Sequence, residues 1–174
     1  VGATNSTSSW WNWNNHGAKQ WLQKGVPANR LAMGVPFYTW RFTGPTGVTG
    51  PISARSYGTY SDAVSKLGQY GMGIYHWDDS ARAPYLTYTE GGTNYFVTYD
   101  DTNSVKYKAQ WCKDNKLGGV MLYELVAGWV NSAPNGKKDP LLKAVKSIIG
   151  GSTMVPTAPA APTPTSPSRG AIDL

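Results

Sequence analysis

The chain has 174 residues, enough for one domain with a sizeable hydrophobic core. Its formal net charge is +6, but the 16 lysines and arginines are scattered and the longest basic run is Lys137-Lys138, so we expect solvated surface charge and no nucleic-acid-binding face. No run of about 18 apolar residues occurs, so the sequence predicts no membrane span.

The N-terminal part is predicted to form a loop, a short helix and a strand. Residues 1–14 are rich in Ser, Thr, Asn and Trp, which is typical of a loop. Asn14 or Asn15 can cap a helix that ends at Gly25. A strand is then expected over about residues 30–37. Because this strand is apolar on both faces, it has the pattern of a parallel strand covered by helices.

The middle of the chain, residues 41–99, is predicted to be a small α+β unit. Residues 43–60 are dense in Gly, Pro, Ser and Thr and leave no room for a long helix. Ser61 is expected to cap a short amphipathic helix. Three short strands follow, with Gly91-Gly92 as the hairpin loop between the last two. Their expected ranges are 72–77, 84–88 and 95–99.

The C-terminal part is predicted to hold two helices around a strand. Asp101 or Thr102 is expected to cap the first helix, which contains Cys112, the one cysteine of the chain. The position of Cys112 among apolar residues favours a buried packing thiol over a reactive one. A strand at residues 117–124 follows, and Asp139-Pro140 opens the last helix. Residues 151–174, rich in Pro, Thr, Ser and Ala, are expected to form an extended linker.

Few residues suit acid–base, nucleophilic or metal chemistry. The ten acidic residues include the adjacent pairs Asp78-Asp79 and Asp100-Asp101, whose side chains point apart and cannot flank one glycosidic bond. The two histidines, His16 and His76, have no metal-ligand spacing, so no metal or other cofactor is expected. No nucleophile-elbow pattern supports a Ser/His/Asp triad. Instead, 8 Trp and 11 Tyr stand against 3 Phe, and rings with a polar edge suit surfaces that stack on sugars or other flat polar ligands.

Four blocks of sequence, taken in their order along the chain, carry a family resemblance: residues 31–38, 77–86, 96–101 and 117–124. In this order they resemble the C-terminal part of the family 18 glycoside hydrolases, the chitinases and their lectin-like relatives, over roughly residues 10–149. The resemblance implies an α/β fold, namely the C-terminal part of a (β/α)8 TIM barrel with an insertion domain between strands 7 and 8. The implied parts are barrel helix 6 and strand 7 (1–40), the chitinase insertion domain (41–99), helix 7, strand 8 and helix 8 (100–150), and the linker (151–174).

The resemblance also implies an activity and its partners. Family members hydrolyse β-1,4-linked N-acetylglucosamine polymers by a substrate-assisted retaining mechanism, in which the sugar's N-acetyl group attacks and one Glu protonates the leaving oxygen. The family's Asp-x-x-Asp-x-Asp-x-Glu strand, which carries that Glu, is absent here, so no catalytic residue is expected in this chain. The N-terminal part of the barrel is expected in a longer parent protein, secreted, whose partner is chitin or chito-oligosaccharides. A non-catalytic chitin-binding lectin of the same fold is the alternative.

Substrate-binding residues are implied at two barrel strands and in the insertion. Tyr123 stands where the family's Gly-Gly-x-Met-x-Trp places the Trp under the reacting sugar, and a packed core tyrosine is the alternative. Glu124 is either a cleft residue or a structural, hydrogen-bonded Glu, because alternation turns it away from Tyr123. Tyr38 matches the Tyr of Pro-x-Tyr-Gly-Arg. The next residues depart from that motif, which makes Trp40 available for stacking and moves the sugar-contacting Arg to Arg41.

Two more substrate-binding residues are implied in the insertion. Trp77 and Tyr85 match a Trp-x-Asp…Pro-Tyr pattern that forms one wall of the family's cleft. Stacking on sugar rings and packing within the small domain are both open for each of them.

Overall fold

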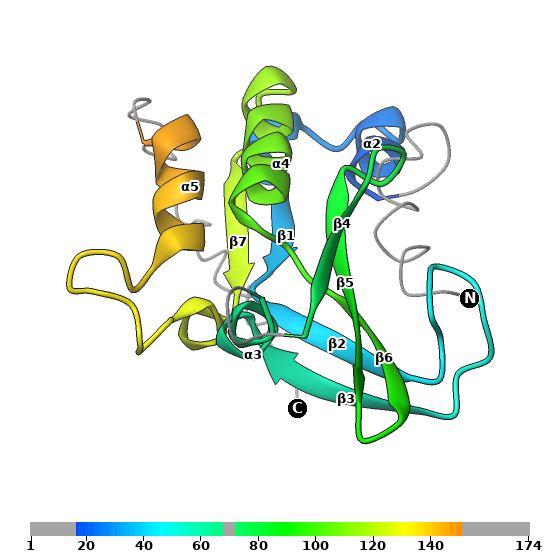
Figure 1. Cartoon of the computed structure of the whole chain (residues 1–174). Coiled ribbons are helices and arrows are strands. Elements are labelled where there is room, and N and C mark those ends of the chain that lie inside the picture. Colours follow the sequence, from blue (N-terminus) through cyan, green and yellow to red (C-terminus); the bar gives the residue numbers. More distant parts are fainter. Residues whose placement is uncertain (1–16, 68–71, 151–174) are drawn as a thin grey trace, which may run out of the picture.

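A computed structural model describes residues 17–67 and 72–150 (Figure 1). The described residues form a mixed α/β fold with two sheets. The predicted loop at 1–14, the caps Asn14 and Asn15, and the predicted linker at 151–174 lie outside the described residues. The helices are α2 (Ala18–Gln23), α3 (Tyr60–Ser65), α4 (Thr102–Asp114) and α5 (Pro140–Ile149), with 3-10 turns η1 (Ala28–Arg30) and η2 (Leu125–Gly128).

The first sheet consists of two parallel strands, β1 (Ala32–Pro36) and β7 (Gly119–Tyr123). The helix α4 connects the other sheet to β7 and packs against both strands (Figure 1). In β1, Met33 and Val35 are buried, whereas Ala32 and Gly34 are exposed. The expectation of a strand buried on both faces is therefore wrong within the described part of the chain, because helices cover only one face there.

The helix α4 begins as predicted, at Asp101. The Asp101 carboxylate accepts hydrogen bonds from the backbone N–H of Asn103 (2.9 Å) and Ser104 (2.8 Å), and the Ser104 hydroxyl accepts one from the Asp101 N–H. This reciprocal capping box satisfies the free donors of the first turn. The helix α5 also begins as predicted, with Pro140 in its first turn, although Asp139 makes no side-chain cap.

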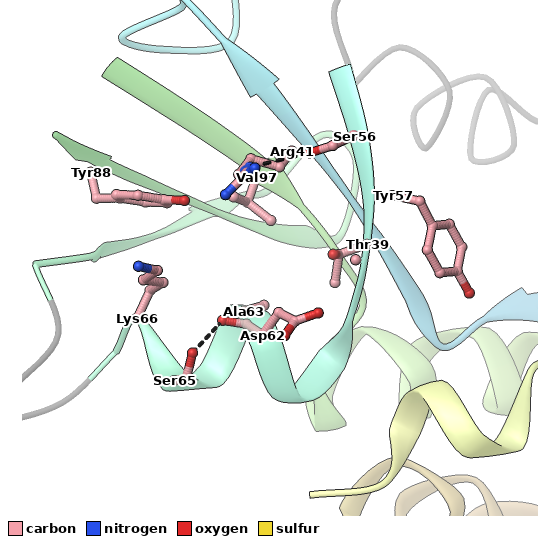
Figure 2. A pocket seen from close by; sticks show the side chains of 11 residues that line it. Thr39, Arg41, Ser56, Tyr57, Asp62, Ala63, Ser65, Lys66, Tyr88 and Val97 are labelled. Carbon is pink, nitrogen blue, oxygen red and sulfur yellow. Dashed lines mark hydrogen bonds between the residues drawn. The ribbon is translucent and has the colours of Figure 1, made fainter. Parts of the chain in front are cut away.

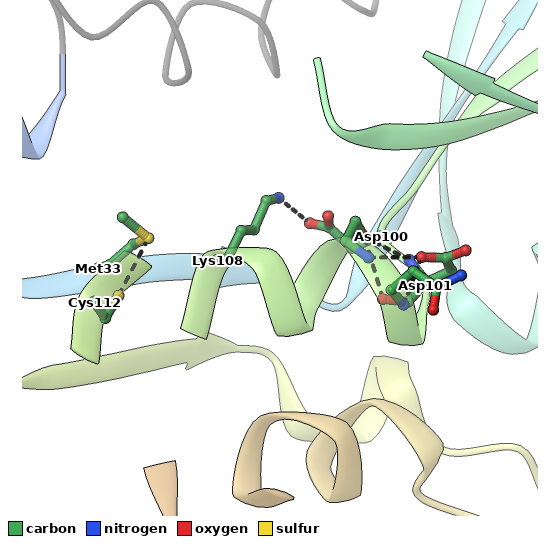
Figure 3. A network of polar contacts seen from close by, with 7 residues as sticks. Met33, Asp100, Asp101, Lys108 and Cys112 are labelled. Carbon is green, nitrogen blue, oxygen red and sulfur yellow. Dashed lines mark hydrogen bonds and ion pairs between the residues drawn. The ribbon is translucent and has the colours of Figure 1, made fainter. Parts of the chain in front are cut away.

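A buried ion pair and a buried thiol lie on the inner face of α4 (Figure 3). Lys108 is fully buried and its ammonium donates to the carboxylate of Asp100, which is 2% exposed. One turn further along, the Cys112 thiol contacts the sulfur of Met33 at 3.5 Å. Burial raises the pKa of Cys112 to about 12. The prediction of a buried packing thiol is confirmed, whereas no sequence pattern predicted the Asp100–Lys108 pair.

The second sheet is antiparallel and has five strands in the order β3-β2-β6-β5-β4. Three of them were predicted: β4 (Ile74–Asp78), β5 (Ala83–Glu90) and β6 (Thr93–Thr98). Gly91-Gly92 is the predicted two-residue hairpin loop. Both glycines have positive φ, of 57° and 75°, which a type I′ turn requires.

The strands β2 (Tyr38–Thr43) and β3 (Ala54–Thr59) were not predicted. The sequence of β2 does alternate aromatic and polar residues, as a strand can, whereas that of β3 is mostly polar, and a segment rich in Gly and Pro separates the two. The expected cap of α3 is also wrong: Thr59, and not Ser61, caps this helix. The Thr59 hydroxyl accepts from the Asp62 N–H (3.1 Å), and the Asp62 carboxylate accepts from the Thr59 N–H (2.7 Å).

The two faces of the five-stranded sheet differ in what they contact. One face carries the buried side chains of Tyr88 and Val97, and Figure 2 shows α3 on this side. Leu86, also buried, pairs with Val97 and so lies on the same face. Directly paired residues point to the same face of a sheet, and neighbours along a strand point to opposite faces. The opposite face therefore carries one cross-strand row of paired residues: Tyr57, Trp40, Thr98, Tyr85 and His76.

Candidate functional site: an aromatic cluster where the two sheets meet

Four aromatic rings gather at the C-terminal ends of β1 and β7. Pro36 pairs with Tyr123, and the N–H of Phe37 donates to the Tyr123 carbonyl at 2.8 Å, so β2 leaves the parallel sheet beside Tyr123. The Tyr38 ring contacts Tyr123 edge-on, with centroids 6.2 Å apart. It also stacks on the ring of Tyr57 at 5.5 Å, with an interplanar angle of 25°. The structure thus brings Tyr38 and Tyr123 together.

Trp40 completes what we call the four-ring cluster: Tyr38, Trp40, Tyr57 and Tyr123. Its ring meets Tyr38 edge-on at 6.4 Å and Tyr57 edge-on at 6.1 Å. The Arg55 guanidinium lies 5.2 Å from the Trp40 ring centroid, within reach of a cation–π contact. Tyr123 and Tyr57 are about half exposed, at 57% and 49%. Rings that are fixed by neighbours yet exposed on one side can stack on a flat ligand.

Glu124 is held at this cluster by a tyrosine. The Tyr57 hydroxyl donates a 2.8 Å hydrogen bond to Oε1 of Glu124, which is half-buried. Partial burial, and then the hydrogen bond to Glu124 and its charge, raise the pKa of Tyr57 to about 12. The phenol therefore stays protonated and donates to Glu124 throughout the neutral pH range. The sequence left Glu124 either as a structural, hydrogen-bonded residue or as a residue of the cleft. The structure shows it hydrogen-bonded and also next to the four-ring cluster. The peptide bond between Tyr123 and Glu124 is cis.

Tyr57 was not among the predicted site residues because β3 was not predicted. The signal that could have found it is the capping box that follows. Thr59 and Asp62 fix the start of α3 and hold Thr59 in an extended conformation, which is compatible with a strand that ends there. Tyr57 is two residues before Thr59, so its side chain lies on the same face of the sheet as that of Thr59.

Tyr85 lies on the same face of the sheet as Trp40 but outside the four-ring cluster. Both residues pair with Thr98, which stands between them. The Tyr85 ring stacks on Phe96 at 4.9 Å and on His76 at 4.6 Å. Tyr85 thus extends the aromatic face toward β4, and part of its ring is engaged in packing.

Arg41 lies on the opposite face of the sheet from the four-ring cluster. Its Nε donates to the Ser56 hydroxyl at 3.2 Å, and its guanidinium lies 5.1 Å from the ring centroid of Tyr95. It lines a pocket of about 300 Å³ between the sheet and α3, together with Asp62 and Lys66 (Figure 2). The structure therefore does not bring Arg41 to Tyr38 and Trp40.

Trp77 is also directed away from the cluster. It pairs with Pro84, one position along from the pair of His76 and Tyr85. Its side chain therefore points to the other face of the sheet from Tyr85 and Trp40. Its ring lies 6.1 Å from that of Tyr107 on α4. Of the seven substrate-binding residues expected from the sequence, the structure gathers four: Tyr38, Trp40, Tyr123 and Glu124.

The chemistry available at the site is binding of a ring-shaped polar ligand. Glu124 supplies a carboxylate whose Oε2 accepts no hydrogen bond from the described residues, and the rings supply stacking surfaces. Within residues 17–67 and 72–150, no three His, Cys, Asp or Glu side chains are grouped so that they could hold a metal ion. In the same residues, no helix is both long and apolar enough to cross a membrane.

Comparisons with known proteins place the chain among carbohydrate-active proteins of one family. The family model described as glycosyl hydrolases family 18 matches residues 2–127. Chitinase A1 of Niallia circulans is 36% identical over 123 residues, 63% of this chain and 17% of that protein. Chitinase B of Serratia marcescens is 33% identical over 133 residues, 60% of this chain and 26% of that protein. The chain thus spans about a quarter or less of the length of these relatives.

Among solved structures, human YKL-39 is similar with a TM-score of 0.64 and 25% sequence identity, over 79% of this chain and 43% of that one. It is described as a pseudo-chitinase with retained chitooligosaccharide-binding properties.

Proposed function

The chain belongs to the family 18 glycosyl hydrolases, and we propose that it is the C-terminal part of the catalytic domain of a secreted chitinase. The parent protein hydrolyses β-1,4-linked N-acetylglucosamine polymers by the substrate-assisted retaining mechanism. The N-acetyl group of the bound sugar attacks, and a Glu outside this chain protonates the leaving oxygen. Residues 1–174 supply part of the substrate cleft.

In this proposal the parallel sheet is the last part of a TIM barrel. The strands β1 and β7 are barrel strands 7 and 8, and α4 and α5 are the helices that follow them. The five-stranded sheet and α3 form the insertion domain between the two strands. The support is the parallel pairing of β1 with β7, with α4 leading into β7. In such barrels the active site lies at the C-terminal ends of the strands, which is where the four-ring cluster lies.

The observation that carries the proposal is the four-ring cluster with Glu124 beside it. Tyr123 is the most exposed of the rings, and the edge of Tyr38 and the fixed Glu124 border it. A pyranose ring placed on Tyr123 stacks its C–H face on the phenol ring. The Oε2 atom of Glu124 is then a hydrogen-bond acceptor for a hydroxyl or amide N–H of the sugar. Tyr123 forms the floor of the subsite for the reacting sugar, and Tyr57 positions Glu124.

The remaining aromatic residues of this face extend the stacking surface. Trp40 lies next to the floor, and Tyr85 lies in the same cross-strand row beyond Thr98. Arg41 and Trp77 have no part in this cleft in our proposal, because both lie on the other face of the sheet.

The second candidate function is a chitin-binding lectin of the same fold. The observation that favours this second candidate is the similarity to human YKL-39, which is described as a pseudo-chitinase with retained chitooligosaccharide binding. A lectin needs the same stacking residues as the enzyme, so the four-ring cluster fits both. The parent sequence before Val1 decides between them: a chitinase has a Glu at the end of Asp-x-x-Asp-x-Asp-x-Glu there, and a lectin has another residue.

We expect the isolated 174-residue chain to show no measurable hydrolysis of chito-oligosaccharides. The proton donor that the mechanism requires is not among these residues, and such a group typically contributes about 10²–10⁴-fold in rate. Product formation from a soluble oligomer is the measurement, with the parent protein as the positive control. Turnover by the isolated chain that disappears in Glu124→Gln or Asp79→Asn would contradict the prediction and place the catalytic acid within the chain.

We also expect the isolated chain to be marginally stable or prone to aggregate. The strands β1 and β7 form a two-stranded parallel sheet, and barrel strands of this kind have neighbours on both sides. Thermal unfolding followed by circular dichroism, with light scattering, checks this. A cooperative transition of a monomer above about 50 °C, inside the usual range of mesophilic domains, would count against the assignment to part of a barrel.

A further inference from the structure

A second group of aromatic and amide side chains lies away from the four-ring cluster, where β4, α4 and α5 meet. These side chains line an open groove of about 410 Å³, made by Trp77, Asn103, Lys106, Tyr107, Gln110 and Ile148. Asn103, Tyr107 and Gln110 are spaced by four and three residues, which puts them on one face of α4. All three are exposed, because the buried residues of α4 occupy the opposite side.

The two rings of the groove are held in place by polar neighbours. Trp77 and Tyr107 have centroids 6.1 Å apart at an angle of 37°. The indole Nε1 of Trp77 donates to Asp79 at 3.1 Å, and the Arg82 guanidinium lies 5.4 Å from the Tyr107 ring centroid. Tyr107 is nevertheless 45% exposed. Rings that are ordered before a ligand arrives lower the entropy lost on binding.

The groove is separate from the proposed cleft. His76 and Tyr85 form one end of the cross-strand row that includes Trp40, whereas Trp77 and Pro84 are the next pair and point to the other face. Trp77 and the four-ring cluster therefore lie on opposite faces of the five-stranded sheet.

We propose that this groove is a second carbohydrate-binding site, which takes a chain of N-acetylglucosamine units outside the catalytic cleft. The proposal rests on the function proposed above. Trp77 and Tyr107 offer stacking surfaces for the C–H faces of successive sugars. The amides of Asn103 and Gln110 can bond to hydroxyl and N-acetyl groups. The Gln110 amide nitrogen donates to Asp114 at 2.7 Å, which fixes this side chain and leaves its oxygen as an acceptor.

The N-acetyl groups select among the possible saccharides. Lys106 lines the groove and Arg82 lies beside it, and these two cations are balanced by Asp79, which accepts from Trp77, and Asp114, which accepts from Gln110. An uncharged, fully N-acetylated chain therefore fits the groove, whereas a deacetylated chain lacks the N-acetyl groups that the amides of Asn103 and Gln110 can bond. The volume lies within the range of about 300–1,000 Å³ that ligand sites usually have, which fits a short segment of an acetylated chain.

The test is adsorption of the parent protein to insoluble chitin, with Tyr107→Ala as the main variant. Alanine is a good helix former and Tyr107 is exposed, so the fold should persist, as circular dichroism can verify. We expect Tyr107→Ala to weaken adsorption about tenfold, as the loss of a main contact residue does. Tyr107→Phe should keep the affinity because it keeps the ring. The kcat/KM for a soluble trimer should not change.

Two controls make the result specific. Trp21→Ala removes an aromatic side chain that is 57% exposed on α2 and lines neither site, and it should bind chitin like the unchanged protein. Adsorption to chitosan, the deacetylated polymer, should be weak and should not depend on Tyr107.

Other results would overturn the proposal in distinguishable ways. Unchanged adsorption in Tyr107→Ala, with turnover still lost in Tyr123→Ala, would remove the second site and leave the proposed function standing. A parent protein that neither binds nor hydrolyses chitin would remove both. A Tyr107→Ala variant that loses turnover on the trimer would make the groove part of the cleft. A change in its sedimentation would make the groove a contact between copies of the chain.

Discussion

Replacing Tyr123 by alanine in the parent protein is expected to lower kcat about 100-fold, the scale on which misplacing a reacting group by 1 Å acts. Tyr123 is 57% exposed and its position is set by the edge of the Tyr38 ring. A floor aromatic holds the reacting sugar in its distorted shape, so its contact is stronger in the transition state than in the ground state. The measurement is kcat and KM on a soluble N-acetylglucosamine oligomer.

The matched control is Trp40→Ala, which removes another ring of the four-ring cluster and leaves Tyr123 in place. Because Trp40 lengthens the stacking surface, its loss should raise KM and spare kcat on short substrates. Tyr123→Trp should be tolerated, since the exposed side of Tyr123 leaves room for a larger ring. If Tyr123→Ala kept kcat while Trp40→Ala abolished it, Tyr123 would not be the floor of the subsite for the reacting sugar.

Breaking the Asp100–Lys108 pair is expected to have the largest effect on stability. Both side chains are almost fully buried, and the pair joins the end of the five-stranded sheet to α4 (Figure 3). Lys108→Met leaves a buried carboxylate without its cation, and Oδ1 of Asp100 already lacks a hydrogen-bond partner among the described residues. Removing one partner of a buried pair typically costs about 3–5 kcal/mol. The shift of the urea unfolding midpoint of the parent protein measures this.

The double variant tests whether the two groups act as a pair. Asp100→Asn with Lys108→Met removes both charges, so its loss of stability should be clearly smaller than the sum of the two single losses. Lys106→Met, at an exposed position of the same helix, is the control and should change little. Additive losses, or a Lys108→Met midpoint equal to that of the control, would show that the ion pair does not stabilise the fold.

The helix starts and hairpin turns that depend on a few neighbouring residues could be predicted from the sequence. Asp101 caps α4 because its carboxylate reaches two backbone donors within three residues, and Gly91-Gly92 forms the hairpin loop because only a tight turn joins β5 to β6. The pairing of β2 with β3 has a weaker signal. Residues 44–53, rich in Gly and Pro, separate the two strands, so no two-residue turn pattern marks the hairpin. Tyr57 was missed for this reason, although it contacts Tyr38 and Trp40 and holds Glu124.

The sequence also could not show to which face of the sheet each candidate side chain points, because that depends on the register of strand pairing. Trp40 and Arg41 are adjacent, and only the register of β2 shows that Trp40 joins the cluster while Arg41 faces α3. Trp77 similarly needs the register of β4 with β5 to place it beside Tyr107. A one-residue change of register reverses such an assignment. The block that holds Tyr123 and Glu124 could be recognised, whereas the hydrogen bond from Tyr57 to Glu124 depends on the tertiary fold.

The most direct test of the account is a crystal structure of the parent protein with a bound N-acetylglucosamine oligomer. We expect one pyranose ring to lie over Tyr123, with its carbons about 3.5–4.0 Å from the phenol ring, the distance of van der Waals contact. A polar group of that sugar should bond to Glu124 while Tyr57 still donates to the same carboxylate. An oligomer bound with Tyr123 and Glu124 both free of sugar contact would contradict the assignment of this cluster to the substrate cleft.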